Sequence, residues 1–320
     1  MAASPGNSSP RLIELSALAP GALNALLEEE TERWRRMLQW DFRASAELVA
    51  RYAGYRALEG FALVEAGEAV GYGYWVLDER KGLIGDLYVR NAWRNAANEV
   101  LLLEAILRQL RRQPWVRRVE AQLLQLGHGA SLSGLTSQPE RFARHFMLAK
   151  LDRAAAFRPV VFGGEIRFER WHMRLAEAAA ALIARVYEGH VDSRINDQYK
   201  SPDGAMRFLQ NIVQYPGCGK FAPECSLLAL EASGEAAGLL LATRVSEESG
   251  HIAQLCVSPR RRGAGLAYEL LRRGMVEFSL RGADFASLTV TAANRPAIGL
   301  YERFGFASIH HFEAQVWDPL

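Results

Sequence analysis

Apolar positions recur along the chain in two series that follow the same order. Each series begins with a short apolar segment that leads into a glycine-centred turn. Residues 63–71 read Leu-Val-Glu-Ala-Gly-Glu-Ala-Val-Gly, and residues 230–238 read Leu-Glu-Ala-Ser-Gly-Glu-Ala-Ala-Gly. Such turns join antiparallel strands into hairpins. The second strands of the two hairpins are predicted at 72–77 and 239–245.

The order of elements after the hairpin is also the same in both series. A further strand, an amphipathic helix with apolar residues at helical spacing, and a fifth strand that closes the series are predicted in each. They occupy residues 83–89, 95–112 and 116–124 in the first series, and 251–257, 263–281 and 286–291 in the second. Two copies of one α/β unit in a single chain predict a tandem protein.

The join between the copies is expected near residues 152–164, where the composition changes without a low-complexity linker. This divides the chain into two predicted domains, 1–155 and 164–320. Because the join has no flexible composition, we expect packed domains rather than freely jointed ones.

Further elements are predicted at the start of the second domain. They are a strand at 166–171 and helices at 175–187 and 203–213. Residues 189–199, between the two helices, have no usable period. Long ordered loops of this kind usually lie near a functional site.

The composition of the 320 residues supports a folded chain: 49% are hydrophobic and 23% are charged. This balance excludes a disordered or collagen-like protein. A formal net charge of +2 gives no global reason to expect a nucleic acid or an anionic membrane as partner. The charged run at residues 28–36 is typical of a solvent-exposed helix face.

The chain carries few signs of export. Its three cysteines are too few for a disulfide scaffold and fit a reducing compartment. Residues 1–10 lack the basic start and apolar run of a signal peptide, and the longest apolar stretch, around 178–184, is too short to span a bilayer. We therefore expect a soluble cytoplasmic protein.

The strongest local signal for chemistry lies at residues 257–267, which read Val-Ser-Pro-Arg-Arg-Arg-Gly-Ala-Gly-Leu-Ala. The segment leaves an apolar strand and enters an amphipathic helix, whose first N–H groups have no intrahelical acceptor. Gly263 and Gly265 allow close approach to a ligand, and three arginines add positive charge. These features favour a diphosphate site, although the turn alone fits an ordinary strand–turn–helix equally well.

The spacing Val-x-Pro-x-x-Arg-x-x-Gly-x-Ala in this segment resembles motif A of the GNAT acetyltransferases. Residues 294–306, Asn-Arg-Pro-Ala-Ile-Gly-Leu-Tyr-Glu-Arg-Phe-Gly-Phe, resemble the second hallmark of that family, Asn-x-x-Ala-x-x-Leu-Tyr followed by Gly-Phe. The resemblance is good over 226–317 and looser back to 166. It implies an α/β protein of two tandem GNAT folds, each a mixed twisted sheet flanked by helices.

The resemblance also implies roles for particular residues. The N–H groups that open the helix would hold the pyrophosphate of acetyl-CoA, and the preceding strand would pair with the pantetheine arm where two parallel strands splay apart. The positions that would contact acetyl-CoA are Leu255, Cys256, Val257, Arg262, Gly263, Ala264, Gly265, Leu266, Ala267, Asn294 and Tyr301.

Two residues are candidates for proton transfer. Tyr301 stands where many family members place the general acid that protonates the departing thiolate. It also fits an aromatic packing cluster with Phe304 and Phe306. His251 stands where several relatives place a base, and it equally fits a histidine at a strand edge. Some relatives use no dedicated base.

The aperiodic segment at 189–199 falls where GNAT enzymes carry a substrate-facing loop. Its polar candidates for contact with the acceptor are Asp192, Arg194, Asn196, Asp197 and Tyr199. Asp192 and Asp197 would suit a cationic amine. A loop that hydrogen-bonds to itself is the alternative for each of these residues.

The first copy departs from the motif at the matching place. It keeps the valine and the arginine, but Ala97 replaces the glycine and Glu99 replaces the final small residue. A carboxylate at this helix start would repel a diphosphate. Domain 1–155 is therefore predicted to be a degenerate GNAT-like domain without a cofactor site, and 164–320 to be the catalytic domain.

The sequence thus predicts an N-acetyltransferase that moves an acetyl group from acetyl-CoA to a primary amine by direct attack in a ternary complex. No cysteine or serine stands where a covalent nucleophile would be needed. A noncatalytic acyl-CoA-binding or sensor protein, and an acyltransferase acting on a protein or peptide amine, are the alternatives. We expect a small-molecule amine acceptor, no metal, no nucleic acid, no membrane, and a monomer or homodimer.

Overall fold

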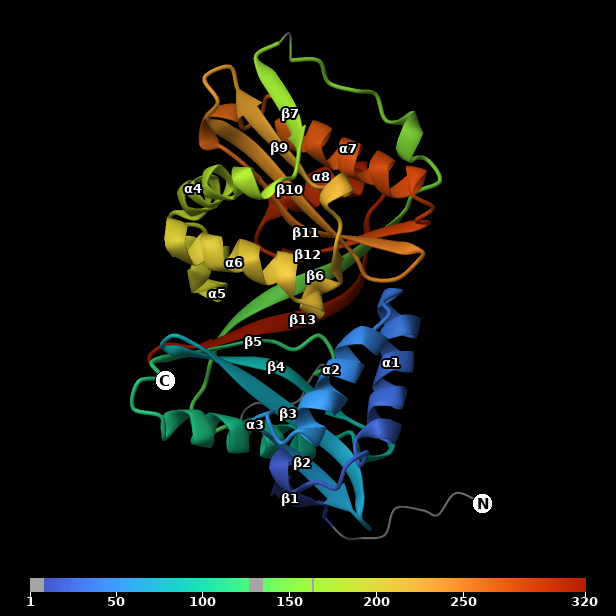
Figure 1. Ribbon diagram of the computed structural model, residues 1–320, viewed down its shortest axis with the longest axis vertical. Helices are drawn as coiled ribbons and strands as arrows, with labels where there is room; N and C mark the ends of the chain where they lie inside the picture. Colours follow the sequence, from blue (N-terminus) through green and yellow to red (C-terminus); the bar gives the residue numbers. More distant parts are fainter. Residues whose placement is uncertain (1–8, 127–134, 163) are drawn as a thin grey trace. The chain divides into compact units, whose positions relative to one another are not determined.

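The computed structural model describes residues 9–126, 135–162 and 164–320 (Figure 1). Residues 1–8, on which the expectation of no signal peptide partly rests, lie outside the described residues. None of the helices in the described ranges has both the length and the apolar character needed to cross a membrane. The expected compartment stays a prediction.

The chain folds into two compact units. Unit 1 comprises Met1–Arg36, Phe42–Ala143 and His311–Leu320, and unit 2 comprises Met37–Asp41 and Arg144–His310. The units do not follow the boundaries 1–155 and 164–320. Residues 144–150, near the end of the first half of the chain, belong to unit 2, and residues 311–320, at the end of the second half, belong to unit 1. The division of the chain by function at those boundaries stays a prediction.

Unit 1 is a six-stranded sheet with helices, in the strand order β1-β2-β3-β4-β5-β13. Its strands are β1 (Arg11–Glu14), β2 (Gly60–Glu65), β3 (Glu68–Asp78), β4 (Lys81–Val89), β5 (Arg118–Gln122) and the end of β13 (Ala307–Trp317). Its helices are α1 (Asn24–Leu38), α2 (Arg43–Gly54) and α3 (Ala96–Arg111). Apolar residues of α3 pack on the sheet in one continuous core.

Unit 2 repeats this plan, in the strand order β6-β12-β11-β10-β9-β7. Its strands are β6 (Glu140–Lys150), β7 (Ile166–Arg170), β8 (Lys220–Phe221), β9 (Leu227–Glu231), β10 (Ala236–Arg244), β11 (Ser249–Val257) and β12 (Phe285–Thr291). Its helices are α4 (Ala176–Tyr187), α5 (Asp192–Ile195), α6 (Pro202–Gln214), α7 (Leu266–Leu280) and α8 (Arg295–Arg303). The 3-10 turn η6 covers Asp197–Lys200.

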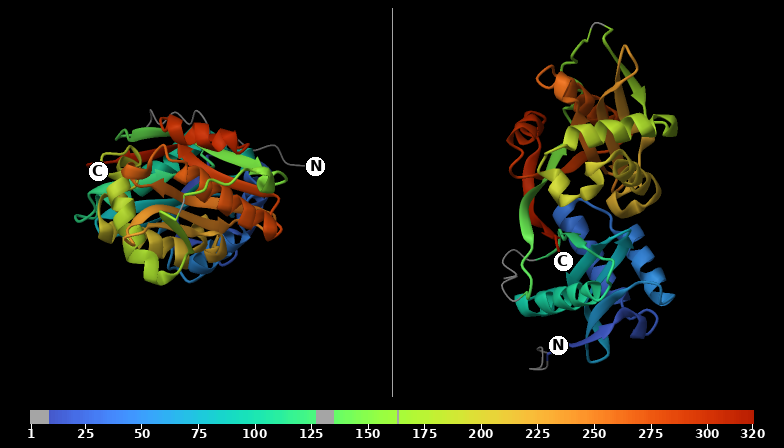
Figure 2. Two further views of the ribbon diagram at one scale, coloured as in Figure 1. Left: turned by 90° about the horizontal axis from the view of Figure 1, so that it is seen from above. Right: turned by 90° about the vertical axis from the view of Figure 1, so that its left-hand side faces the viewer.

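Two separate cores cover the faces of the unit 2 sheet. One core joins α7 and α8 to one face, and the other joins α4 and α6 to the opposite face. Figure 2 shows the same arrangement from two further directions. The mixed α/β fold class predicted from the sequence is confirmed, and the predicted hairpins, central strands and amphipathic helices lie within a few residues of the observed ones.

Two expectations about elements are wrong. The predicted fifth strands are present as β5 and β12, but neither closes its series: β13 pairs beyond β5 with Trp317 opposite Val119, and β6 pairs beyond β12. Their partners are distant in sequence, so no local pattern links them. Residues 189–199 are not an extended loop, because α5 and η6 form there.

Candidate active site

The two central strands of unit 2 separate at their carboxyl ends. Strands β11 and β12 are parallel, and their pairing runs from Ser249 opposite Phe285 to Ile252 opposite Leu288. Beyond that point β11 continues to Val257 and β12 to Thr291 without being paired to each other. The strands therefore form the splay that the sequence comparison led us to expect.

A β-bulge marks the place where the strands part. Ala253 is an extra residue in β11, because its neighbours Ile252 and Gln254 pair with consecutive residues of β10. A bulge bends its strand and increases the local twist. The bulge thus turns the end of β11 away from β12.

The register of β11 shows which main-chain groups face the splay. The Ser258 N–H donates to the Ala237 carbonyl of β10 at 2.8 Å. In an antiparallel pair, hydrogen-bonded and non-hydrogen-bonded residues alternate. Cys256 therefore turns its N–H and C=O toward β10, whereas Leu255 and Val257 turn theirs toward the splay.

Helix α7 begins beside this splay with its N–H groups uncapped. Gly263 and Gly265 have φ of 76° and 81°, a left-handed conformation that glycine adopts easily. Gly265 is the N-cap residue, and no side chain among the described residues caps this helix. The N–H groups of Leu266, Ala267 and Tyr268 therefore have no intrahelical acceptor.

The arginines before α7 have different environments. Arg262 is exposed, and Arg261 forms ion pairs with Glu231 at 2.5 Å and with Glu165 at 3.0 Å. Arg261 is thus tied to the β9–β10 turn, while Arg262 at the glycine turn remains directed to solvent.

Tyr301 lies at the core side of α8 and is 8% exposed. Its ring packs against Phe306 at 6.0 Å between centroids, so the aromatic cluster considered from the sequence exists. Burial raises the pKa of the phenol, and the nearby Asp192 carboxylate adds to the effect. The phenol is protonated at neutral pH and has a proton to donate.

Asp192, on α5, lies close to Tyr301 and to Thr291, the last residue of β12. The Thr291 hydroxyl donates a hydrogen bond to Asp192 Oδ1, and the His190 ring lies 3.7 Å from Oδ2. Asp192 also contributes to the raised pKa of Tyr187 and Tyr199. The structure therefore brings Asp192 and Tyr301 to the same site, at the open end of the splay.

A buried network behind Asp192 involves residues that the sequence analysis did not single out. Gln254 Nε2 donates to the Tyr187 hydroxyl at 2.6 Å, and the Tyr199 hydroxyl donates to Gln254 Oε1 at 3.3 Å. The Tyr187 and Tyr199 rings are stacked at 4.5 Å. Thr291, Gln254 and Tyr187 gave no sequence signal, because each resembles an ordinary strand or helix residue until its partner is known.

The other candidates of the 189–199 segment lie in different surroundings. Asn196 accepts the Gln198 N–H at 3.0 Å and so begins η6, as the self-bonded alternative supposed. Arg194 is exposed, and Asp197 is half-buried. Asn294 behaves like Asn196, because its side chain accepts the Ala297 N–H at 3.3 Å and begins α8.

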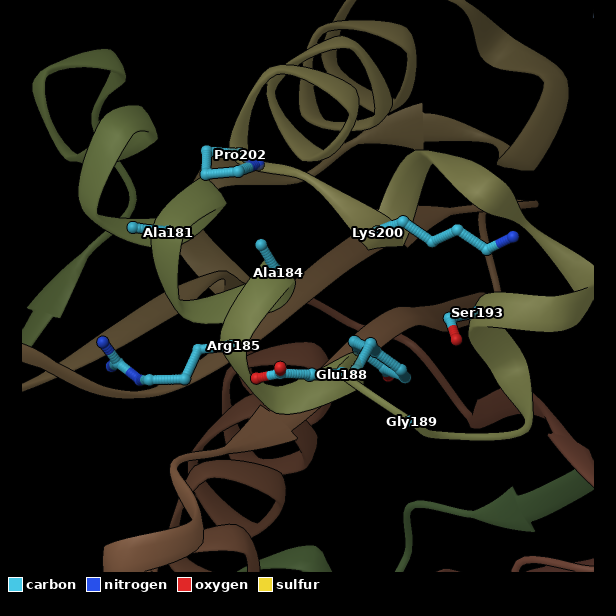
Figure 3. A pocket seen from close by; sticks show the side chains of 9 residues that line it. Ala181, Ala184, Arg185, Glu188, Gly189, Ser193, Lys200 and Pro202 are labelled. Carbon is cyan, nitrogen blue, oxygen red and sulfur yellow. The ribbon is translucent and has the colours of Figure 1, made fainter.

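A surface pocket of about 530 Å³ lies between α4 and the 189–202 segment. Figure 3 shows Arg185 on α4 and Glu188 just after its end, with Ser193 and Lys200 on the other side. Tyr187 also lines the pocket. Its volume is within the range of small-molecule sites, and its wall adjoins the Asp192 site through Ser193 and Tyr187.

His251 lies deeper in unit 2 than a base at the splay would. It is 5% exposed, its Nδ1 lies 2.9 Å from the Ser287 hydroxyl, and its ring packs against Trp40 at 5.1 Å. Burial lowers the pKa of the imidazole to about 3, and Arg144 adds to that effect. His251 is therefore neutral and enclosed.

Unit 1 has the same strand geometry at the matching place. Gly85 is the extra residue of a bulge in β4, and the parallel pairing with β5 ends at Ile84 opposite Ala121 although β4 continues to Val89. The helix that follows, α3, begins differently from α7. Asn95 caps it, because its side chain accepts the Asn98 N–H at 2.9 Å.

Glu99 occupies the start of α3 in an unexpected way. It is 3% exposed, and the Arg94 Nε donates to its Oε1 at 3.2 Å. The carboxylate is therefore not an open negative group at the helix mouth. It is buried and pairs with Arg94. Arg262 holds the matching position in the second copy and is exposed.

Comparisons with known proteins agree with this architecture. The acetyltransferase (GNAT) family model matches residues 185–306. The chain is 37% identical over 86 residues to the mycothiol acetyltransferase of Clavibacter michiganensis subsp. michiganensis, a match that covers only 27% of this chain and 28% of that protein.

Two solved structures resemble nearly the whole chain. A GCN5-related N-acetyltransferase from Sphaerobacter thermophilus matches with a TM-score of 0.69 and 19% identity, covering 96% of this chain and 95% of that one. A tandem GNAT protein from the clavulanic acid biosynthesis pathway matches with a TM-score of 0.64 and 16% identity, covering 97% and 98%. The GNAT family model therefore matches residues 185–306, within a chain that has the fold of tandem GNAT proteins.

Proposed function

We propose that unit 2 transfers an acetyl group from acetyl-CoA to the primary amine of a small molecule, by direct attack in a ternary complex. The observation that carries this proposal is the combination at the carboxyl end of β11. Main-chain groups of Leu255 and Val257 face an open splay, directly beside the uncapped, glycine-lined start of α7.

These residues fit an acyl-CoA by their chemistry. A helix start with unsatisfied N–H groups binds a pyrophosphate, and Arg262 is available there to add positive charge. An extended amide chain can pair with Leu255 and Val257 as an added strand. When bound, acetyl-CoA supplies an activated thioester carbonyl, so no nucleophile from the protein is needed.

The side chains around the splay have roles that follow from their positions. A main-chain N–H of β11 stabilises the negative charge that develops on the thioester oxygen during attack. Tyr301 is protonated at neutral pH, and it donates that proton to the thiolate as the carbon–sulfur bond breaks. The Asp192 carboxylate, held by Thr291, binds the incoming ammonium group.

His251 is disfavoured as the base by the same geometry. Its enclosed ring has the pKa of about 3 described above, so it takes up a proton only in strong acid. We propose instead that Asp192 or water receives the proton of the amine. The pocket beside Tyr187 and Ser193 supports a small-molecule acceptor over a peptide, because its volume is that of a small ligand.

Replacing Tyr301 by phenylalanine tests the proposal. With acetyl-CoA and a panel of primary amines, release of CoA thiol should be rapid in the wild type and about 10²-fold slower in Tyr301→Phe, since a general acid contributes at least that factor. Affinity for acetyl-CoA should stay within about twofold. Tyr215→Phe removes an exposed hydroxyl elsewhere in unit 2 and is the matched control, expected to be unchanged.

Three other outcomes would change the assignment. Tight binding of acetyl-CoA without thiol release for any amine would favour the noncatalytic binding protein. Release with peptide amines alone would favour the peptide acyltransferase. An unaltered rate in Tyr301→Phe would remove the acid role of the phenol.

A further inference from the structure

A group of cationic and amide side chains lies at the carboxyl ends of β4 and β5 in unit 1. Arg33 comes from α1, Arg94 from the turn before α3, and Gln125 follows β5. In open α/β sheets this edge is the usual place for a ligand. The diphosphate chemistry of unit 2 is blocked here, because the start of α3 is capped by Asn95.

Arg33 is half-buried, and its hydrogen bonds go to neutral groups. Its Nε donates to Gln125 Oε1 at 2.5 Å, and its Nη1 donates to Asn91 Oδ1 at 3.2 Å. Burial lowers the pKa of the guanidinium, and the neighbouring Arg94 lowers it further. The Arg33 guanidinium thus lies near that of Arg94, and its hydrogen-bond acceptors are neutral amide oxygens that do not balance its charge.

Two donors in this cluster have no hydrogen-bond partner within the described ranges of the chain. They are Gln125 Nε2 and Arg94 Nη2, and both atoms are buried. Gln125 is only 2% exposed, and its carboxamide is fixed against Arg33 by its other atom. A buried donor without an acceptor destabilises the folded protein, so a ligand that brings an acceptor to these atoms would be stabilised there.

The net charge of the cluster indicates which kind of hydrogen-bond acceptor would bind there. Glu99 pairs with Arg94 and neutralises one of the two guanidinium groups. One positive charge therefore remains, centred on Arg33. A carboxylate brings a single negative charge, and its planar pair of oxygens matches guanidinium and carboxamide donors.

We infer that unit 1 binds a small carboxylate-bearing molecule through Arg33, Arg94 and Gln125, at the edge of its sheet where unit 2 has its acyl-CoA site. This site is independent of acyl transfer by unit 2. Unit 1 would then bind a carboxylate with side-chain donors, whereas unit 2 would bind a diphosphate with the N–H groups at the start of a helix.

Titration of the full chain with acetate and succinate, against phosphate at constant ionic strength in chloride, tests the site. The carboxylates should raise the thermal unfolding temperature of the wild type, and Arg33→Met should weaken their apparent affinity at least tenfold. Arg36→Met, an exposed arginine three residues along α1, is the matched control and should bind as the wild type does. Stabilisation that is equal for phosphate, or equal in Arg33→Met, would overturn the inference.

Gln125→Glu provides a second test that does not depend on choosing the right ligand. It places a carboxylate next to the Nε of Arg33, so it supplies a negative group from within the protein. We expect a higher unfolding temperature than the wild type in carboxylate-free buffer, and no further rise on adding acetate. A buried glutamate that lowers the unfolding temperature would show that the cluster carries no surplus positive charge.

Discussion

The starts of α3 and α7 occupy matching positions in the two units and differ in their N-terminal caps. Each helix follows a bulged strand that separates from its parallel neighbour. At α3 the side chain of Asn95 accepts the Asn98 N–H, whereas the N-cap of α7 is a left-handed glycine that has no side chain to accept an N–H. The strand geometry is therefore common to both units, and the difference lies in a single turn.

The charges at the two helix starts also differ, and the start of α7 is the more favourable one for an anion. Glu99 is buried in the first turns of α3 and pairs with Arg94, so it neutralises the charge of that arginine. Ala267 holds the matching motif position in α7, and Arg262 is exposed. If unit 2 binds acyl-CoA as proposed and unit 1 does not, the open N–H donors and the exposed arginine would be needed in addition to the splayed sheet.

Placing the Glu99 carboxylate of unit 1 at the matching position of unit 2 should have the largest effect of the changes considered, on the affinity for CoA. Ala267→Glu introduces a carboxylate at the start of α7, where it would pair with Arg262 and repel the pyrophosphate. We expect the affinity for CoA, measured by calorimetry, to fall at least 100-fold.

Ala267→Gln is the control for this substitution, because it adds the same bulk without the charge. If the neutral variant loses as much affinity as Ala267→Glu, the comparison of charge between the two helices fails. Unchanged affinity in both variants would show that the start of α7 does not hold the pyrophosphate.

Local features of the fold and of the site could be predicted from the sequence because they depend on neighbours in the chain. The glycine turn at 263–265 and the helix after it are examples. The exchange of β6 and β13 could not be predicted, since a strand pattern does not name its partner. The 28–36 run misled for a related reason: Glu30, predicted to be solvent-exposed, is fully buried against Tyr72 and Trp34.

The chemistry of single residues was predictable only in part. The family position suggested Tyr301 as the acid, which stays a prediction, and the suggestion of His251 as base assumed an open strand edge. The structure instead places His251 against Trp40 and Phe146, from segments far away in the chain. Burial by distant segments is what changes the pKa of a histidine, and no local pattern contains that information.

His251 also gives unit 2 an acid sensitivity that unit 1 lacks at the matching position, Leu83. The folded imidazole has a pKa of about 3, while the unfolded one has a pKa of about 6.5. The unfolded state therefore binds more protons below pH 6.5, and stability present above that pH is lost as the pH falls toward 3. The loss between pH 7 and pH 5 should be about 2 kcal/mol.

His251→Leu, which copies unit 1, should flatten this dependence. Hydrogen exchange of β11 and α7 amides at pH 5 and pH 7 would measure it, corrected for intrinsic exchange rates. The constant change in stability that any core substitution causes does not matter, because the slope with pH is the readout. A slope equal to that of the wild type would show that other groups cause the acid sensitivity.

The cap of α3 should give the smallest effect, and it separates stability from ligand binding. Asn95→Ala removes the acceptor of the Asn98 N–H, and loss of an N-cap costs about 1 kcal/mol. Asn95→Gly should cost only a few tenths of that amount, because glycine is tolerated at this position.

Neither Asn95 variant should gain affinity for CoA in unit 1, since Glu99 still pairs with Arg94. Urea unfolding and CoA titration of an Ala267→Glu background, in which unit 2 no longer binds, would measure both quantities. A gain of CoA binding on removing Asn95 alone would mean that the cap, and not the buried carboxylate, keeps the first helix start closed.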